Sequence, residues 1–468
     1  MFKDYFEVRK WLESYIPQTY TKKELGLGRI KYLLKLLDNP QDKFKSIHVA
    51  GTSGKGSTAF YISRLLKESK SQRVKVGLHL SPHLVDIRER LQINGKLVPM
   101  NRFIKLLNEI KPVVEVIQKS KPELTPSYFE ILVAASFLYF AQSKVDWAVV
   151  EVGLGGRLDA TNVLNPEVSV ITNIGLDHTD ILGKTIEEIA REKAGIIKSD
   201  KRQVTSDKLI EKGVPVVTGA SGVALRVIEN VAKEKKAKLI TIGTRLGIQP
   251  LKSDIKDYLV IYRDILNSKK VFVTREVFLL CIKSLSSLGI YPIRSQIIEA
   301  FSTPFAGRFE EIEPGVILDG AHNIEKIKAL VNFLKSSQFT VHSSQFTVVI
   351  AFKKGKDWKG MLRLLIKELD IERIIATQFY AVTDTGPPSR KATEGQAPFA
   401  AVDPEEIADY VRSIVNRRST IVNAISNSQE AVFETLDARR LDSNQLILVT
   451  GSLYLVGEVR TMWKLPEF

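Results

Sequence analysis

The sequence contains one cysteine, Cys281, among 468 residues. A single thiol cannot form an intrachain disulfide, and it excludes a zinc site built from several cysteines. No segment approaches the ~18 consecutive apolar residues that a membrane-spanning helix needs. The longest apolar run, Ile131 to Ala141, is typical of a buried helix. The N-terminal segment carries charges throughout and lacks the apolar stretch of a signal peptide. We therefore expect a cytoplasmic protein that binds no membrane.

The sequence also lacks any basic run interleaved with aromatic residues and any RNA-binding signature. Its net charge is nevertheless +15, which makes an anionic partner plausible. Charge alone does not separate nucleic acid from small polyanions such as ATP. Because no nucleic-acid motif accompanies the charge, we expect small-molecule partners and no nucleic acid.

Short Val- and Ile-rich runs alternate with longer helical patterns, which indicates parallel sheets covered by helices. We predict an α/β protein with two domains. Residues 1–305 form an N-terminal phosphate-loop domain whose mostly parallel sheet is flanked by helices, and residues 306–468 form a smaller, Rossmann-like C-terminal α/β domain. The predicted strands are 46–50, 74–80, 147–152, 168–174, 214–218, 239–242, 316–318, 348–351, 373–377 and 446–449, with a hairpin at 90–98.

Two segments have no assigned role. The hexapeptide SSQFTV occurs at 336–341 and again at 343–348, and its second copy is expected to supply a strand. Residues 383–400 are rich in Pro, Gly and Thr, which is typical of a surface loop.

Residues 46–58, SIHVAGTSGKGST, read as an apolar strand, a glycine-rich turn and the start of a helix. Such a turn lets backbone N–H groups surround phosphate oxygens, and the helix N-terminus adds positive potential. Lys55 would reach the β- and γ-phosphates, and a hydroxyl of Ser57 or Thr58 would touch magnesium. The spacing is shorter than that of the usual Walker loop, and a closely packed structural turn is the alternative. The predicted nucleotide-binding residues here are Gly51, Thr52, Gly54, Lys55, Gly56, Ser57 and Thr58.

Three other predicted strands end in residues that can bind a metal ion. Ser81, Glu151 and His178 follow or end the strands at 74–80, 147–152 and 168–174. Ligands bind outside the carboxyl ends of parallel strands, so these side chains are expected near the phosphate loop. Each also has a purely structural alternative: Ser81 as the cap of a turn, Glu151 as a partner in an ion pair, and His178 as a hydrogen-bonded loop histidine. Histidine is an unusual ligand for the hard magnesium ion.

The motifs HVAGTSGKGST, HLSPHLVDIRERLQING, VVEVGLGGRLDATNVL and TNIGLDHTDILGKTIEEIAREKAGIIK resemble those of folylpolyglutamate and dihydrofolate synthases. These enzymes belong to the wider Mur ligase family. GRFE, LDGAHN and LVTGSLYLVGEVR resemble the C-terminal domain of the same family, and the match runs in order from residue 26 to residue 460.

The resemblance implies an ATP-dependent ligase with two magnesium ions. A pteroate or folate carboxylate would be phosphorylated by ATP, and L-glutamate would attack the acyl phosphate. The implied metal ligands are Ser57, Ser81, Glu151 and His178. Lys193 corresponds to a lysine that is carbamylated in relatives. Arg308 and Asp319 correspond to residues that contact ATP, and His322 is expected to face the transferred phosphate.

The sequence departs from the family on the helix before the interdomain linker. Relatives commonly carry a His-Gln…Asn motif whose asparagine touches adenine, whereas residues 271–285 read VFVTREVFLLCIKSL. The alternatives are a Mur-type ligase of a cell-wall precursor and a nucleotide-binding regulatory protein without ligase activity. The sequence does not choose between dihydropteroate and a reduced folate as substrate. We expect a monomer.

Overall fold

The structure, a computed structural model, divides into two compact units, Met1–Thr303 and Pro304–Phe468. The residues that the structure describes are 1–17, 25–69, 74–200, 204–205, 208–209, 212–242, 261–262, 265, 273–336, 345–380, 400–415, 420–441 and 445–463. Most of the first SSQFTV copy and residues 383–399 lie outside these ranges.

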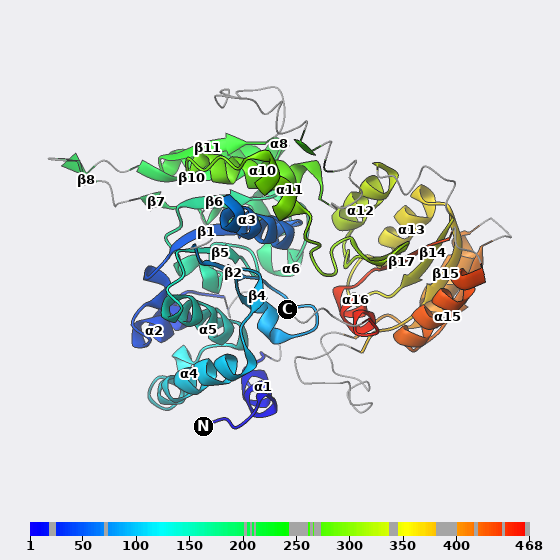
Figure 1. The fold of residues 1–468 in the computed structure, drawn as a ribbon, viewed down its shortest axis with the longest axis horizontal. Coiled ribbons are helices and arrows are strands. Elements are labelled where there is room, and N and C mark those ends of the chain that lie inside the picture. Colours follow the sequence, from blue (N-terminus) through cyan, green and yellow to red (C-terminus); the bar gives the residue numbers. More distant parts are fainter. Residues whose placement is uncertain are drawn as a thin grey trace. The chain divides into compact units, whose positions relative to one another are not determined.

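The first unit is built on one large, mostly parallel sheet (Figure 1). Its strand order is β11 (Ala237–Thr241), β10 (Lys212–Thr218), β6 (Val168–Ile171), β1 (Lys45–Ala50), β5 (Trp147–Glu151), β2 (Val76–His79), β3 (Leu91–Ile93) and β4 (Lys96–Leu97). The first six of these strands are parallel. The hairpin of β3 and β4 is antiparallel, as is the short β7 (Ser199–Asp200) beside β10. A separate two-stranded sheet joins β8 (Val204–Thr205) and β9 (Lys208–Leu209).

The central strands are almost wholly buried because helices cover both faces of the sheet. All five residues of β5 are buried, as expected for a strand with no solvent-facing side. One face packs against α3 (Lys55–Ser69), which in turn contacts α10 (Arg275–Ser287) and α11 (Arg294–Phe301). The other face packs against α5 (Tyr128–Gln142), α7 (Ile186–Ala194) and α8 (Gly222–Glu234). The apolar run from Ile131 lies in α5, which confirms the predicted buried helix.

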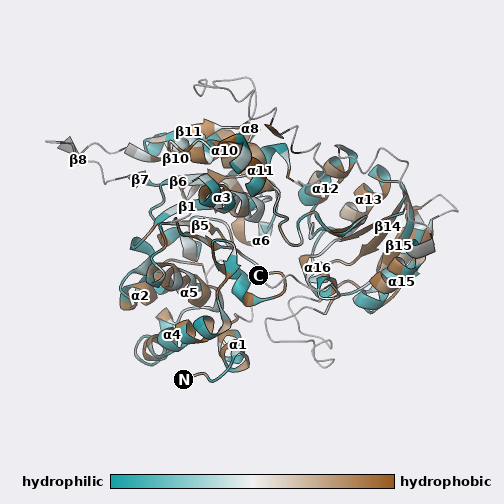
Figure 2. Cartoon of the chain, viewed as in Figure 1, coloured by the Kyte–Doolittle hydropathy of each residue, from teal (hydrophilic) through white to brown (hydrophobic). Residues whose placement is uncertain are grey.

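The described part of the first unit also contains the helices α1 (Tyr5–Glu13), α2 (Gly28–Leu36), α4 (Met100–Ser120) and α6 (Thr179–Leu182). Among them α4 buries Phe103, Leu106 and Ile110, whereas Lys105 is exposed and Asn108 and Glu109 are partly buried. Hydrophilic and hydrophobic residues accordingly alternate along this helix (Figure 2). No helix in the described ranges is long and apolar enough to cross a membrane.

The second unit contains a six-stranded sheet of order β12 (Glu310–Glu313), β13 (Val316–Leu318), β17 (Leu446–Thr450), β14 (Phe346–Ile350), β15 (Ile371–Ala376) and β16 (Ile421–Ala424). Only the pair of β12 and β13 is antiparallel. Its helices are α12 (Ile324–Ser336), α13 (Trp358–Glu368), α14 (Pro404–Ile414), α15 (Ser428–Leu441) and α16 (Leu453–Arg460). The second SSQFTV copy enters β14, as predicted.

The parallel register brings the carboxyl ends of four strands to one edge of the first sheet. Val49 pairs with Glu151, Ala50 pairs with Ile171, and His79 pairs with Val150. The segments that follow β1, β2, β5 and β6 therefore begin at the same level. The phosphate loop and the segments of Ser81, Glu151 and His178, all predicted to bind nucleotide or metal, begin at this edge.

Candidate functional site

The phosphate loop connects β1 to α3 through two glycines with positive φ angles. Gly51 has φ 146° and Gly54 has φ 78°, a region that glycine adopts more readily than other residues. A Cβ atom at Gly51 would lie 1.8 Å from the hydroxyl oxygen of Thr172, so no side chain fits there. The loop is thus shaped by glycine, as the sequence predicts.

Hydrogen bonds from the end of β6 fix the shape of this loop. Asn173 accepts two of these hydrogen bonds. Its backbone carbonyl accepts the Thr52 N–H at 2.9 Å, and its side-chain oxygen accepts the Ser53 N–H at 2.8 Å. The Thr172 hydroxyl donates to the Ser53 carbonyl at 2.6 Å. Sequence reasoning missed Thr172 and Asn173, although two polar residues directly after a buried strand were a usable signal.

Two lysines converge on the carbonyl oxygen of Gly51. Lys55, at the start of α3, donates to it at 3.1 Å, and Lys193, from α7, donates at 2.8 Å. Lys193 is buried, and this loss of hydration, together with the charge of Lys55, lowers the pKa of Lys193 to about 7. The structure thus brings a residue from 142 positions along the chain to the phosphate loop.

Glycines allow the loop after β5 to lie directly against α7. A Cβ atom at Gly156 would lie 2.8 Å from the Glu192 carbonyl oxygen, too close for any side chain. Beside it, the Arg157 guanidinium forms an ion pair with Glu192 at 2.8 Å. The Asn162 side chain donates to the Gly195 carbonyl at 3.1 Å. These contacts hold the backbone on both sides of Lys193.

A buried hydrogen-bond chain supports the same loop from β1. The Thr161 hydroxyl donates to Asp159 at 2.5 Å, so it accepts from Nε2 of His48, which lies 2.8 Å away. Burial lowers the pKa of His48 to about 3, so its ring is neutral. Asp159 also accepts the N–H groups of Leu154 and Thr161. This histidine has a structural role.

Glu151 and Ser81 meet at the ends of β5 and β2. The Ser81 N–H donates to the Glu151 carboxylate at 2.9 Å, and Glu151 is buried. The Ser81 hydroxyl oxygen is buried and forms no hydrogen bond with any described residue, and the same holds for the hydroxyl of Thr58 in α3. Buried polar atoms are normally satisfied. Oxygen ligands of this kind suit a magnesium ion.

His178 and Ser57 are placed by local structure. His178 has a left-handed backbone (φ 52°) at the start of α6, and its Nε2 lies 3.9 Å from a carboxylate oxygen of Asp177. Ser57 lies half-buried in the first turn of α3. Within the described ranges, no group of three or more His, Cys, Asp or Glu side chains is arranged to hold a metal ion. The four predicted metal ligands do not form a group of this kind, because two of them, Ser57 and Ser81, would bind through hydroxyl oxygens.

The loop after Ser81 is ordered by residues that the sequence reasoning did not single out. Glu89 accepts the N–H groups of Leu84, Val85 and Asp86. The Arg90 Nε–H donates to Nδ1 of His83 at 2.9 Å. Arg90 is buried, so this imidazole faces a fixed positive charge.

Residues 271–285 stand where relatives carry the adenine-binding motif. Residues 275–285 of this segment lie in α10, and residues 271 and 272 lie outside the described ranges. Its first turn lies beside the phosphate loop, since a Cβ atom at Gly54 would lie 3.6 Å from Cγ2 of Val277. The Cys281 thiol is buried and donates to the Thr58 carbonyl at 3.6 Å. Helix α10 thus contacts both the phosphate loop and α3.

In the second unit, Asp319 follows β13 and is held by backbone groups. Its two carboxylate oxygens accept the N–H groups of Phe309 at 2.8 Å and Ala321 at 2.9 Å. Burial raises the pKa of Asp319, and the Arg308 guanidinium opposes that rise. The two predicted ATP contacts of this unit are therefore near each other.

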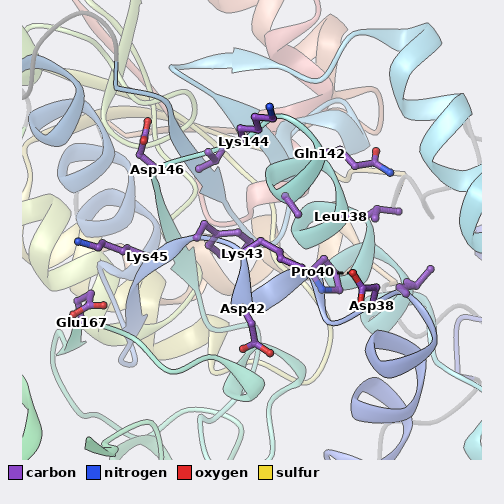
Figure 3. Close-up of a pocket in the computed structure, with 14 residues that line it drawn as sticks. Asp38, Pro40, Asp42, Lys43, Lys45, Leu138, Gln142, Lys144, Asp146 and Glu167 are labelled. Atoms are coloured by element: carbon purple, nitrogen blue, oxygen red, sulfur yellow. Dashed lines mark hydrogen bonds and ion pairs between the residues drawn. The ribbon is translucent and has the colours of Figure 1, made fainter. Parts of the chain in front are cut away.

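A cavity of about 930 Å³ lies elsewhere in the first unit (Figure 3). Its lining includes Lys45 at the start of β1, Asp146 just before β5 and Glu167 just before β6. It therefore opens at the opposite ends of the strands from the phosphate loop. None of the predicted site residues lines it. The glycine loop and the side chains predicted to bind metal lie at the carboxyl ends of the strands, which are therefore the candidate site.

The fold and the glycine loop define a phosphate-loop α/β protein, and comparisons with known proteins identify its family. A profile of the Mur ligase middle domain matches residues 49–256, and one of the dihydrofolate synthetase C-terminal domain matches residues 308–462. The chain is 32% identical over 483 residues to a dihydrofolate synthase/folylpolyglutamate synthase of Bacillus subtilis, covering 99% of this chain and 100% of that protein. It is 31% identical over 460 residues to a dihydrofolate synthetase of Saccharomyces cerevisiae, covering 93% and 97%.

A solved structure of a folylpolyglutamate synthase has the same fold as this chain. The folylpolyglutamate synthase of Mycobacterium tuberculosis complexed with ADP superimposes with a TM-score of 0.76 at 26% identity, covering 98% of both chains. The chain belongs to the dihydrofolate synthase and folylpolyglutamate synthase family of ATP-dependent ligases. This confirms the resemblance seen in the sequence and favours it over a cell-wall precursor ligase.

Proposed function

We propose that the chain joins the carboxylate of a pteroate or folate to the amine of L-glutamate, using ATP and an acyl-phosphate intermediate. The observation that carries this proposal is the edge of the first sheet. There Lys55 and Lys193 meet at Gly51, and Ser81 meets Glu151. Such an edge suits phosphoryl transfer, in which charge neutralisation and positioning do most of the work.

The nucleotide phosphates bind to the loop from Gly51 to Thr58. Its backbone N–H groups and the Lys55 ammonium neutralise the negative charge of the phosphates. The buried hydroxyls of Ser81 and Thr58 fit a hard cation. Ser57, Ser81, Glu151 and His178 would hold magnesium, which when bound supplies further positive charge to the phosphate oxygens.

The reaction proceeds in two displacements. An oxygen of the substrate carboxylate attacks the γ-phosphorus of ATP, the bond to the bridging oxygen breaks, and ADP leaves. The glutamate amine then attacks the acyl carbon, inorganic phosphate leaves, and the nitrogen loses a proton as the amide forms. In both steps the Lys55 ammonium would stabilise the negative charge that develops on the phosphate oxygens. In the second unit, Arg308 and Asp319 are the residues that we propose to contact ATP.

An assay of ADP release tests the proposal. Purified protein is incubated with ATP and magnesium, with dihydropteroate and a reduced folate in parallel, each with and without L-glutamate. We expect ADP release only when the pteroate or folate and glutamate are both present, and the active acceptor identifies the substrate. Nucleotide binding without such dependent hydrolysis would instead support a regulatory protein.

Two further expectations concern the protein in its cell. We propose that it is a monomer, which light scattering checks. We also propose a cytoplasmic location, since ATP, folates and glutamate are available there; fractionation of cells checks this.

A further inference from the structure

Thr52, in the phosphate loop, is tied by three hydrogen bonds to the segment of residues 172–178 that follows β6. Its backbone N–H donates to the Asn173 carbonyl at 2.9 Å. Its hydroxyl donates to the Gly175 carbonyl at 3.2 Å and accepts the Gly175 N–H at 3.0 Å. A hydroxyl has a single hydrogen to donate, and Thr52 is buried. Both hydrogens that Thr52 could donate to a phosphate are therefore directed at Asn173 and Gly175.

Gly175 lies three residues before His178, the predicted metal ligand of this segment. The carbonyl of His178 accepts the N–H groups of Ile181 at 3.0 Å and Leu182 at 2.8 Å, where α6 begins. Ile181 and Leu182 are buried in a small apolar cluster. The backbone of His178 is thus held between two anchors, the Thr52 hydroxyl at Gly175 and the buried side of α6.

Other hydrogen bonds hold only the first residues of the 172–178 segment. The Thr172 hydroxyl donates to the Ser53 carbonyl at 2.6 Å, and the Asn173 side chain accepts the Ser53 N–H at 2.8 Å. Of the bonds between this segment and the phosphate loop, those of the Thr52 hydroxyl lie nearest to His178 along the chain. The Thr52 hydroxyl is therefore the group best placed to transmit a change in the loop to His178.

Thr218, at the end of β10, makes the same kind of hydrogen-bond pair away from the predicted site residues. Its hydroxyl donates to the Ile171 carbonyl at 2.9 Å and accepts the Ala220 N–H at 3.0 Å. Thr218 is buried like Thr52. Removing its hydroxyl therefore reports the general cost of losing two buried hydrogen bonds at a strand end.

We propose that Thr52 is a positioning residue whose hydroxyl couples the phosphate loop to His178, so that a nucleotide bound to the loop orders a predicted metal ligand. This rests on the proposed function. The ligand classes are a nucleoside triphosphate at the phosphate loop and a divalent cation at the 172–178 segment.

Hydrogen exchange of the full chain tests this coupling without an activity assay. A non-hydrolysable ATP analogue is added in EDTA, so that no metal ion links the two segments. The quantity compared is the slowing of exchange that the analogue causes in peptides of residues 50–60 and of residues 174–182. We expect both peptides to slow in the wild type.

Thr52→Val removes the hydroxyl and keeps the shape of the side chain. In this variant the slowing should persist at residues 50–60 and fall by about tenfold at residues 174–182, the effect of one to two hydrogen bonds. Thr52→Ser, which retains a hydroxyl, should behave as the wild type does, and so should the matched control Thr218→Val.

Turnover gives a second measurement, because a misplaced metal ligand and a lost nucleotide contact respond to different additions. Thr52→Val should raise the magnesium concentration for half-maximal turnover by about tenfold and KM for ATP by less than about threefold. Excess magnesium should restore most of its kcat. Thr52→Ser and Thr218→Val should stay near the wild type in both quantities.

In the wild type, slowing at residues 50–60 without slowing at 174–182 would overturn the proposal, and this outcome depends on the folding of no variant. An unchanged Thr52→Val, or equal losses in Thr52→Val and Thr218→Val, would also overturn it. A raised KM for ATP that excess magnesium does not correct would show direct contact of Thr52 with the nucleotide and have the same consequence. Absence of slowing at residues 50–60 would instead contradict nucleotide binding by the phosphate loop, and with it the proposed function.

Discussion

At the scale of single residues, the candidate metal site depends most on Glu151, whose carboxylate ends β5 and accepts the Ser81 N–H. Glu151→Gln keeps the acceptor for that N–H but removes the negative charge that would hold the metal. We expect turnover to fall at least about a hundredfold with little change in the free energy of unfolding. Steady-state kinetics and urea denaturation measure the two quantities.

The matched control for this substitution is Glu167→Gln. Glu167 precedes β6 at the opposite end of the strands, and its loss should leave turnover near that of the wild type. Near-normal activity of Glu151→Gln would remove Glu151 from the site.

Lys193 gives a second prediction at this scale. A carbamate forms when a neutral amine adds to carbon dioxide, and a pKa of about 7 makes the neutral amine the main form at pH 8 and a minor form at pH 6. We expect Lys193 to be carbamylated, so that its anionic end serves the metal site. Lys193→Ala should be nearly inactive, and short carboxylic acids added in solution should restore part of its turnover.

Lys198→Ala is the control for that experiment. Burial lowers the pKa of Lys198 to about 8 as well, but its ammonium donates to the Asn162 carbonyl, away from the phosphate loop. Its turnover should not respond to added carboxylic acids. An unmodified ammonium at Lys193 in a high-resolution structure with nucleotide and metal bound would contradict carbamylation.

At the scale of elements, α10 raises the question of how adenine is held. The helix lies beside the phosphate loop but lacks the adenine-contacting asparagine of relatives. One lost hydrogen bond is worth ~0.5–1.5 kcal/mol, about a threefold to tenfold change in affinity. GTP should therefore compete with ATP better here than in a relative with the complete motif, as competition assays measure. Exclusion of GTP by a thousandfold or more would show that another group recognises adenine.

The strands differ in how well the sequence predicts them. Buried parallel strands such as β1 and β5 were predicted because most of their residues are apolar, with Val or Ile at their centres. Edge strands β12 and β16 were missed. Residues 310–313 read EEIE, and every residue of β16 keeps some exposure to solvent, so neither carries a continuous apolar signal.

The same limit applies within the site. Glycine spacing predicts the phosphate loop, because phosphate binding demands that residue type at those positions. The role of Asn173 depends on backbone partners that only the folded chain brings together. The contacts of His322 likewise become clear only in the folded chain, where Nδ1 lies 2.7 Å from the Gly320 carbonyl oxygen and Nε2 lies 2.7 Å from Nζ of Lys326.

At the scale of the whole molecule, each unit has its own sheet and its own buried core. We expect the two units to unfold at different urea concentrations, because a chain with several domains need not unfold in one transition. Hydrogen exchange read separately for peptides of residues 1–303 and 304–468 measures both midpoints. Both units contain predicted ATP contacts, so each midpoint tests the contacts of its own unit.

A non-hydrolysable ATP analogue with magnesium should raise the midpoint of the first unit, because a ligand at ~100 times its Kd stabilises the state that binds it by ~2.7 kcal/mol. If Arg308 and Asp319 hold the same nucleotide, the midpoint of the second unit should rise as well. Asp319→Ala should abolish the second shift and retain the first, a comparison that holds even if the substitution lowers the starting stability. An unchanged second midpoint in the wild type would remove Arg308 and Asp319 from the nucleotide site, whereas an unchanged first midpoint would contradict nucleotide binding by the phosphate loop.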